Sequence, residues 1–357
     1  MKIFFVIKAL NLPAGTERAT INLANELSQR NYDIGLISFA NDGEPFFAVN
    51  SKVKLFYLHK NHDKRSGIVR DISRRIKLRK LYKEEKPDLI IIVGSGRSML
   101  NIPAARGIKK ITWEHFNANI NWHLFHPLSR KLAAMYSDSI VTLTNQDAEN
   151  YKEKFSAKRV VCIPNPITIN NATKSPLTEK RVLAIGRFMK QKGFDYLIDA
   201  WSKVENRNKG WKLRIVGTGP LLPLMLEKIK QYNLEDSIEL IPTSNNVIEQ
   251  YQQASIYVMS SRYEGLPLVL IEAMAMGLPI ISFDCETGPR DIVESDITGR
   301  LVPPFDIDKL AFELDALMNN ESKRKFYSKN AIRNVVKFDT EKIIDKWETL
   351  FQEIIMK

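Results

Sequence analysis

Residues 260–277 carry the residue types with the clearest potential for chemistry. Two glutamates, Glu264 and Glu272, are separated by seven residues of a largely apolar stretch. Gly265 lets the backbone come close to a ligand, and Pro267 suits the first turn of a helix, where its missing N–H costs nothing. Glu272 would lie on that helix among core-like neighbours, where a carboxylate needs a polar partner. Because free N–H groups at a helix start attract phosphate, the segment predicts an anion site with two placed carboxylates.

Arg187 and Lys192 form a second candidate site. Arg187 directly follows a strand-like run and Gly186, and Lys192 precedes Gly193. In doubly wound sheets the carboxyl ends of the strands face the ligand crevice. Two cations at such an end suit a diphosphate, since Arg offers a planar donor fork and Lys a mobile point charge. Taken alone, the pair is better explained as two exposed cations on a basic protein.

The elements that must position these residues alternate along the chain. Short continuous apolar runs suit strands that are buried on both faces of a parallel sheet, and their alternation with helices predicts α/β units. The pattern restarts in the second half, which predicts two doubly wound domains. The expected strands are 3–7, 33–39, 53–58, 88–94, 110–114, 139–144, 181–186, 212–216, 237–241, 256–260, 279–283 and 300–302. The expected helices are 16–30, 66–86, 127–137, 193–206, 220–232, 246–254, 267–276, 306–319, 321–337 and 340–356.

The length of the chain also favours two domains. A chain of 357 residues is more than one core usually serves. Pro and polar residues gather near 164–180, as in a linker. We therefore expect an N-terminal domain over 1–168, a C-terminal domain over 169–339 and a final helical segment over 340–357.

These segments, in this order, resemble the retaining glycosyltransferases of family 4, which have the GT-B fold and an E-x7-E motif. The glutamate spacing alone is a weak signal, but the ordered set is specific and covers nearly the whole chain. The resemblance implies two Rossmann-like domains with a cleft between them, and a C-terminal helix that crosses back to the first domain. The matching segments are Ala14–Arg18, Gly186-Arg187 with Lys192-Gly193, Val216–Gly219, 260–277 and Gly277-Leu278-Pro279.

The resemblance implies that the second domain binds the sugar donor. Arg187 and Lys192 would bind its diphosphate, and Glu272 would accept hydrogen bonds from two ribose hydroxyls, as a carboxylate can. Glu264 would lie near the transferred sugar. The remaining donor-side residues would contribute through the backbone: Gly15, Gly186, Gly217, Gly265 and Leu266. The family often has two glycines in the first loop, whereas this chain has Ala14-Gly15.

The acceptor side falls in the first domain. The family places a histidine at a strand end, facing the reacting sugar, and His115 matches it. Glu114 would orient His115, and Ser95 could touch the acceptor. Ser95 is not a hydrolase nucleophile, because it lacks the G-x-S-x-G pattern. Catalytic roles thus fall to Glu264, His115, Arg187 and Lys192.

No metal or cofactor is expected. Asp306-Ile307-Asp308 spells the D-x-D sequence that holds a metal in another glycosyltransferase fold class. Here it precedes an apolar helical pattern, which favours Asp306 as an N-cap. The two cations, Arg187 and Lys192, would instead stabilise the leaving diphosphate.

The expected activity is transfer of a hexose or N-acetylhexosamine from a nucleotide sugar, preferably a UDP-sugar, with retention of configuration. Residues 283–290 resemble the family branch that builds bacterial surface polysaccharides, which implies a glycan acceptor on a polyprenyl lipid. Two alternatives stay open. One is a UDP-sugar epimerase of the same fold, and the other is a non-catalytic module that binds an anionic polymer or a membrane.

The composition indicates the cellular compartment in which the protein works. The chain is 44% apolar and 26% charged, as in an ordinary soluble globular protein. Cys162 and Cys285 are too far apart to indicate a disulfide framework or a zinc site, which fits a reducing cytoplasm. No apolar run reaches the ~20 residues of a spanning helix, and the apolar start is too short for a signal peptide. We expect a cytoplasmic protein that can be peripheral on the membrane.

The formal charge of +12 is concentrated in residues 60–86, where eleven Lys and Arg face four Asp and Glu. Ile68, Ile72 and Ile76 recur there at the spacing of an amphipathic helix. The first interpretation is a solvated basic face with the isoleucines on the core. The second is attraction to anionic lipid headgroups. Nucleic acid is not expected as a partner, because no zinc finger, recognition helix or aromatic-interleaved basic motif supports it.

Overall fold

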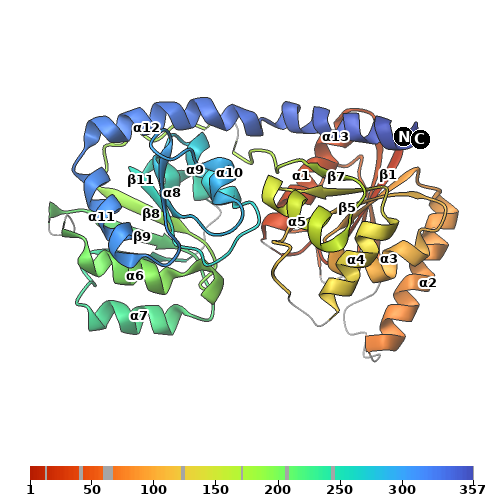
Figure 1. Ribbon diagram of the computed structural model, residues 1–357, viewed down its shortest axis with the longest axis horizontal. Coiled ribbons are helices and arrows are strands. Elements are labelled where there is room, and N and C mark those ends of the chain that lie inside the picture. The colour runs from red at the N-terminus through yellow and green to blue at the C-terminus, as the bar shows by residue number, and fades with distance from the viewer. Residues whose placement is uncertain are drawn as a thin grey trace. The chain divides into compact units, whose positions relative to one another are not determined.

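The computed structural model divides the chain into two compact units (Figure 1). It describes residues 1–357 except 13, 40–42, 59–66, 122–124, 170–171, 206–208, 243–245 and 357. Unit 1 comprises Met1–Pro166 and Thr340–Lys357, and unit 2 comprises Ile167–Asp339. The chain thus leaves unit 1 within the Pro-rich segment near 164–180 and returns to it at Thr340.

Unit 1 is built on a seven-stranded sheet in which all pairs are parallel. The strand order is β3-β2-β1-β4-β5-β6-β7. The central strands are almost entirely buried on both faces, as their continuous apolar runs predict. The bounds are β1 Lys2–Ile7, β2 Asp33–Ser38, β3 Lys54–Tyr57, β4 Leu89–Val93, β5 Lys109–Trp113, β6 Ser139–Thr142 and β7 Val160–Cys162.

Helices connect these strands, and three of the elements were not predicted from the sequence. β7 has three half-buried residues, α3 contains a proline, and α5 is polar along most of its length, so none gives a strong apolar periodicity. α5 is started instead by its cap, because the Thr144 side chain accepts the Asp147 N–H. The helices are α1 Gly15–Gln29, α2 Gly67–Glu85, α3 Ser98–Ala104, α4 His126–Tyr136, α5 Asn145–Phe155 and α13 Thr340–Ile355, with a 3-10 turn η1 Ser95–Arg97.

Unit 2 repeats the plan with a six-stranded parallel sheet, in the order β10-β9-β8-β11-β12-β13. Its strands are β8 Arg181–Ile185, β9 Lys212–Val216, β10 Ile238–Ile241, β11 Ile256–Met259, β12 Ile280–Phe283 and β13 Gly299–Val302. Its helices are α6 Phe194–Lys203, α7 Leu222–Gln231, α8 Val247–Gln252, α9 Leu268–Ala275, α10 Pro289–Ile292, α11 Ile307–Met318 and α12 Glu321–Asn334, with 3-10 turns η2 Lys190–Lys192 and η4 Val335–Phe338.

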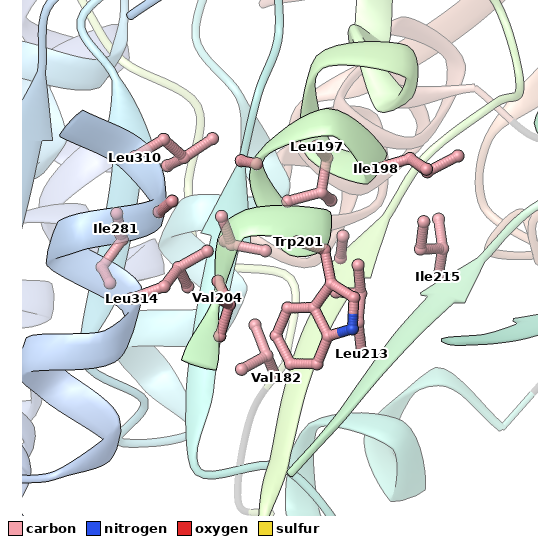
Figure 2. Close-up of a cluster of buried hydrophobic side chains, with 14 of the residues drawn as sticks. Val182, Leu197, Ile198, Trp201, Val204, Leu213, Ile215, Ile281, Leu310 and Leu314 are labelled. Carbon is pink, nitrogen blue, oxygen red and sulfur yellow. The ribbon is translucent and has the colours of Figure 1, made fainter. Parts of the chain in front are cut away.

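The core of unit 2 lies between its sheet and the helices α6 and α11. Trp201 of α6 is fully buried among strand residues such as Val182 and Leu213, and Leu314 of α11 closes the other side (Figure 2). The indole N–H of Trp201 donates to the Ser237 hydroxyl at 3.1 Å. This satisfies the single polar group of the ring. The apolar cluster as a whole packs the helices on the sheet whose loops carry the candidate site.

α13 belongs to unit 1 although it ends the chain. Its Trp347 is fully buried and packs edge-to-face on Trp113 of β5, with ring centroids 5.0 Å apart. Arg30, which follows α1, pairs with Asp345 at 2.9 Å and with Glu348 at 2.5 Å, and it also bonds Glu341. An aromatic contact and a cation shared by three carboxylates thus hold α13 against the rest of unit 1.

The expected orientation of the basic helix α2 is wrong. Ile72 and Ile76 are 56% and 63% exposed, and the helix packs inward through Leu78 and Tyr82 instead. The four-residue spacing predicted the helix correctly, but the inner face is formed by Leu78 and Tyr82, with the partly buried Leu81 beside them. α2 therefore presents isoleucines and cations to solvent together. No helix of the described residues has the length and hydropathy needed to cross a membrane.

Candidate functional site

The sheet of unit 2 brings three of the candidate residues to one place. Its strand order reverses between β8 and β11, and the loops that follow these two strands leave the sheet at the same edge. Ligands of open α/β sheets bind in the crevice at such a switch point. Arg187 and Lys192 lie in the loop after β8, and Glu264 lies in the loop after β11.

Lys192 and Glu264 are in direct contact. The Lys192 ammonium lies 2.7 Å from Glu264 Oε1, and Glu264 is only 7% exposed. The Glu264 main-chain carbonyl accepts from the Thr287 hydroxyl at 2.6 Å, which fixes the turn. A buried carboxylate is costly unless it is paired, so the lysine is the group that makes Glu264 tolerable at this depth.

Arg187 differs from Lys192. Its side chain is exposed, and no ion pair involves it within the part of the chain that the structure describes. The neighbouring Arg262, by contrast, is held by Asp195 at 2.8 and 2.5 Å and stacks on Tyr196. Arg187 is thus a guanidinium at the ligand edge that can turn its donors toward an anion.

Glycines hold the donor-side loops in contact. A Cβ on Gly217 would lie 1.9 Å from the Gly186 carbonyl oxygen, so the loops after β8 and β9 touch there because Gly217 lacks a side chain, and a Cβ on Gly186 would lie 3.2 Å from the Lys192 side chain. The Phe188 N–H donates to the Thr218 carbonyl at 2.8 Å across the same junction. Gly186 and Gly217 therefore let the two loops pack closely at the carboxyl edge of the unit 2 sheet.

Glu272 is buried in α9, where it is 3% exposed. Both of its carboxylate oxygens accept from hydroxyls: Oε1 from Thr168 at 2.5 Å and Oε2 from Tyr251 at 2.8 Å. The polar partners that its position requires are present. Neither Thr168 nor Tyr251 was predicted from the sequence, because single hydroxyl residues far from a motif carry no pattern.

Gly265 and Leu266 stand just before α9. Leu266 is buried, and the N–H groups of both residues make no backbone hydrogen bond among the residues described. Pro267 is the residue before the first helical position, Leu268. The approach to α9 thus offers two backbone donors beside the Lys192–Glu264 pair.

In unit 1 the strand order reverses between β1 and β4. Gly15 is the exposed first residue of α1, which follows β1. Ser95 follows β4, and His115 follows the neighbouring strand β5 by two residues. The candidates of this unit thus also lie at the carboxyl edge of their sheet.

Glu114 is the centre of a buried network. Its Oε2 accepts from the Ser95 hydroxyl at 2.5 Å and the Tyr151 hydroxyl at 2.6 Å, with the Arg130 Nε at 3.6 Å. Its Oε1 accepts the main-chain N–H of His115 at 3.1 Å. Glu114 therefore fixes the backbone of His115 and not its ring. Ser95 has no exposed surface, and its hydroxyl hydrogen is donated to Glu114. Arg130 and Tyr151 had no sequence signal.

His115 is 7% exposed, and its Nε2 has no hydrogen-bond partner among the described residues. The centroid of its ring lies 4.3 Å from that of Trp113, and the two rings are tilted by 50°. Burial lowers the pKa of His115 to about 3, so the imidazole is neutral at physiological pH. Nearby, burial raises the pKa of the Asp147 carboxyl to about 6. A buried nitrogen without a partner is uncommon and marks His115 as a group that can bond a ligand.

Asp306 is an N-cap, as predicted: its carboxylate accepts the Lys309 N–H at 2.9 Å at the start of α11. Across the described residues, no group of three or more His, Cys, Asp or Glu side chains is arranged to hold a metal ion.

Two family models match the chain and together cover most of it. The model described as Glycosyltransferase Family 4 matches residues 13–171, and the model described as Glycosyl transferases group 1 matches residues 167–334. Each match corresponds closely to one of the two parallel-sheet units.

Relatives extend over the full length. An uncharacterized glycosyltransferase of Haemophilus influenzae is 35% identical over 97% of this chain and 99% of its own. The amylovoran biosynthesis glycosyltransferase AmsD of Erwinia amylovora is 31% identical over 98% and 99%. A Campylobacter jejuni α-1,4-N-acetyl-D-galactosaminyltransferase, named for an oligosaccharide on PP-undecaprenol, is 29% identical over 99% and 99%.

Solved structures agree on the fold. The pneumococcal O-GlcNAc transferase GtfA, solved with UDP and GlcNAc, superposes with a TM-score of 0.83, at 16% identity, over 100% of this chain and 99% of its own. The fold agrees with both the family models and the full-length relatives. The chain belongs to the GT-B glycosyltransferases of family 4.

Proposed function

We propose that this glycosyltransferase moves a hexose or N-acetylhexosamine from a UDP-sugar to a glycan acceptor, with retention of configuration. The observation that carries the proposal is the Lys192–Glu264 pair at 2.7 Å beside the exposed Arg187, at the switch point of the unit 2 sheet. Two cations and one carboxylate at a ligand edge suit a diphosphate bonded to a sugar.

In the proposed reaction, the bond between the sugar C1 and the diphosphate oxygen breaks while an acceptor oxygen bonds C1 on the same face. Arg187 and Lys192 stabilise the negative charge that grows on the diphosphate. A diphosphate oxygen takes the acceptor proton, so the products are the glycoside and UDP. With its pKa lowered to about 3, His115 is too weak a base for this proton, and it acts as a hydrogen-bonding group toward the sugar.

Supporting observations for the donor and the stereochemistry come from similar proteins. The structure of GtfA contains UDP, which favours a uridine nucleotide here. The Campylobacter relative is named for an α-1,4 linkage, and an α product made from an α-linked nucleotide sugar is the outcome of retention. Because the proposed cations take the role of a metal at the leaving group, the reaction needs no obligatory metal ion.

The acceptor we propose is a polyprenyl-linked oligosaccharide, in bacterial surface polysaccharide biosynthesis. The Erwinia relative is named for amylovoran biosynthesis and the Campylobacter relative for an acceptor on PP-undecaprenol. The exposed face of α2 supports peripheral association with the cytoplasmic membrane surface. There Val69, Ile72 and Ile76 are exposed among Arg75, Arg79 and Lys80, a combination that favours anionic lipid.

The test begins with a thermal-shift screen of purified protein against a panel of UDP- and GDP-sugars. The stabilising sugar nucleotide is then incubated with polyprenyl-diphosphate oligosaccharides, and free UDP is measured. UDP that appears only with acceptor supports transfer. Conversion of the donor into an epimer without acceptor identifies an epimerase, and no stabilisation by any sugar nucleotide contradicts the proposal.

A further inference from the structure

The two hydroxyls on Glu272 come from separate parts of unit 2 and belong to no sequence motif. Thr168 lies at the start of the unit, and Tyr251 lies on α8. We propose that Thr168 and Tyr251 are positioning residues, which hold the Glu272 carboxylate in the orientation that receives the ribose hydroxyls of the donor nucleotide. This inference rests on the proposed function and on the ribose-binding role that the family resemblance implies for Glu272.

A glutamate needs such help because its last torsion is broad and has no strong preferred value. Each carboxylate oxygen has two lone pairs. The Thr168 hydroxyl occupies one site on Oε1 and the Tyr251 hydroxyl occupies one site on Oε2. Two donors on opposite oxygens fix the plane of the carboxylate, and a carboxylate has more acceptor sites than these two bonds use.

Both positioning residues are themselves held firmly. Tyr251 is fully buried, and its ring lies 5.9 Å from the ring of Tyr257 on β11. On the other side, the N–H of Ile167, next to Thr168, donates to the Phe338 carbonyl at 2.8 Å. The two hydroxyls therefore approach Glu272 from a packed helix and from an anchored segment, as a rigid support requires.

The primary test is Tyr251→Phe, which removes the hydroxyl and keeps the ring. Calorimetry would measure the affinities for UDP and for 2′,3′-dideoxy-UDP. We expect UDP affinity to fall about 5- to 10-fold, the scale of one ordinary lost hydrogen bond, while the dideoxy affinity changes little. The ratio of the two affinities therefore falls. A merely structural effect would weaken both ligands equally and leave the ratio unchanged, which would overturn the inference.

Two matched controls separate positioning from packing. Tyr257→Phe makes the same change on the adjacent buried ring, whose hydroxyl lies near the backbone of Ile185, and should leave the ratio at its wild-type value. Thr168→Val should lower the ratio as Tyr251→Phe does, whereas Thr168→Ser, which keeps a hydroxyl, should preserve it. Equal ratios in the Val and Ser variants would contradict the role of Thr168.

Glu272→Gln distinguishes failure of this inference from failure of the proposed function. If Glu272→Gln leaves the UDP to dideoxy-UDP ratio at the wild-type value, Glu272 does not bind ribose and the positioning role has no basis, whereas the Lys192–Glu264 site that carries the proposed function is still tested by the transfer assay. If that variant lowers the ratio but Tyr251→Phe and Thr168→Val do not, the ribose site stands and the positioning role is wrong.

Discussion

Arg187 and Lys192 look alike in the sequence, but the structure gives them different energetic roles. Lys192 neutralises the buried Glu264, whereas Arg187 is exposed. Arg187→Ala should therefore lower kcat with a free energy of unfolding within about 0.5 kcal/mol of wild type. Lys192→Ala should lower kcat and also destabilise the fold by about 3 kcal/mol, because it leaves a buried charge unpaired. Denaturant titration and kcat measurements would check both.

A double variant serves as the control for this pair. Lys192→Gln combined with Glu264→Gln removes both charges, so most of the lost stability should return while activity stays low. If Lys192→Ala proves as stable as wild type, the ion pair contributes nothing to folding. If Arg187→Ala keeps the wild-type kcat with the natural donor, the diphosphate site lies elsewhere.

His115 should make stability depend on pH. Its folded pKa of about 3 lies below the unfolded value near 6.5, so the unfolded chain binds the proton first. Stability is then lost as the pH falls below about 6.5, by at most about 1.4 kcal/mol per pH unit. Asp147 acts in the opposite sense, because its raised pKa of about 6 costs stability as the pH rises from about 4 to 6.

The measurement is urea unfolding at several pH values for wild type, His115→Asn and Asp147→Asn. Between pH 6.5 and 4.5, His115→Asn should lose less stability than wild type, and Asp147→Asn should lose more. His115→Asn should also slow transfer with UDP affinity nearly unchanged. Parallel pH curves for all three proteins would contradict the burial of these two groups.

The packing of α13 on unit 1 depends on Arg30. Three carboxylates of that helix bond its guanidinium and raise its pKa. Arg30→Met should destabilise unit 1 by about 1–2 kcal/mol, since the bonds are charge-assisted but partly exposed. Amide hydrogen exchange over 340–356 should become faster. Arg159→Met is the control, because Arg159 bonds a single α13 carboxylate, that of Glu353. Equal exchange in the two variants would contradict a special role for Arg30.

α2 should bind anionic membranes through both components of its exposed face. Ile72→Ser with Ile76→Ser should weaken liposome binding at all salt concentrations, because apolar burial is not screened. Replacing Arg75, Arg79 and Lys80 with Gln should weaken it mainly at low salt, where each charge contributes ~1 kcal/mol. The control replaces the exposed unit 2 residues Lys212, Lys230 and Lys329. If wild type ignores anionic liposomes at low salt, α2 is only a solvated face.

The parts of the fold that local sequence patterns determine could be predicted from the sequence. Buried parallel strands are continuous apolar runs, so every strand of the two sheets except the half-buried β7 could be predicted, with limits within one or two residues. The contacts within the site could not be predicted from the sequence. Lys192 and Glu264 are 72 residues apart, and Tyr151 and Glu114 are 37 apart. Such pairs depend on strand order, which periodicity does not reveal. The inner face of α2 was wrong for a related reason, because choosing among apolar positions requires the packing partner.

The charges of the proposed diphosphate site bear on whether the reaction needs a metal ion. The residues proposed for the leaving diphosphate are two cations, and Asp306 of the D-x-D sequence is engaged as the cap of α11. Fixed positive charges can stabilise a departing diphosphate as a divalent ion does. Wild-type activity should therefore remain largely intact in EDTA, and added Mn²⁺ should not rescue Arg187→Ala. Complete loss in EDTA that Mn²⁺ restores would mean that a metal ion, and not the cationic pair alone, stabilises the leaving group.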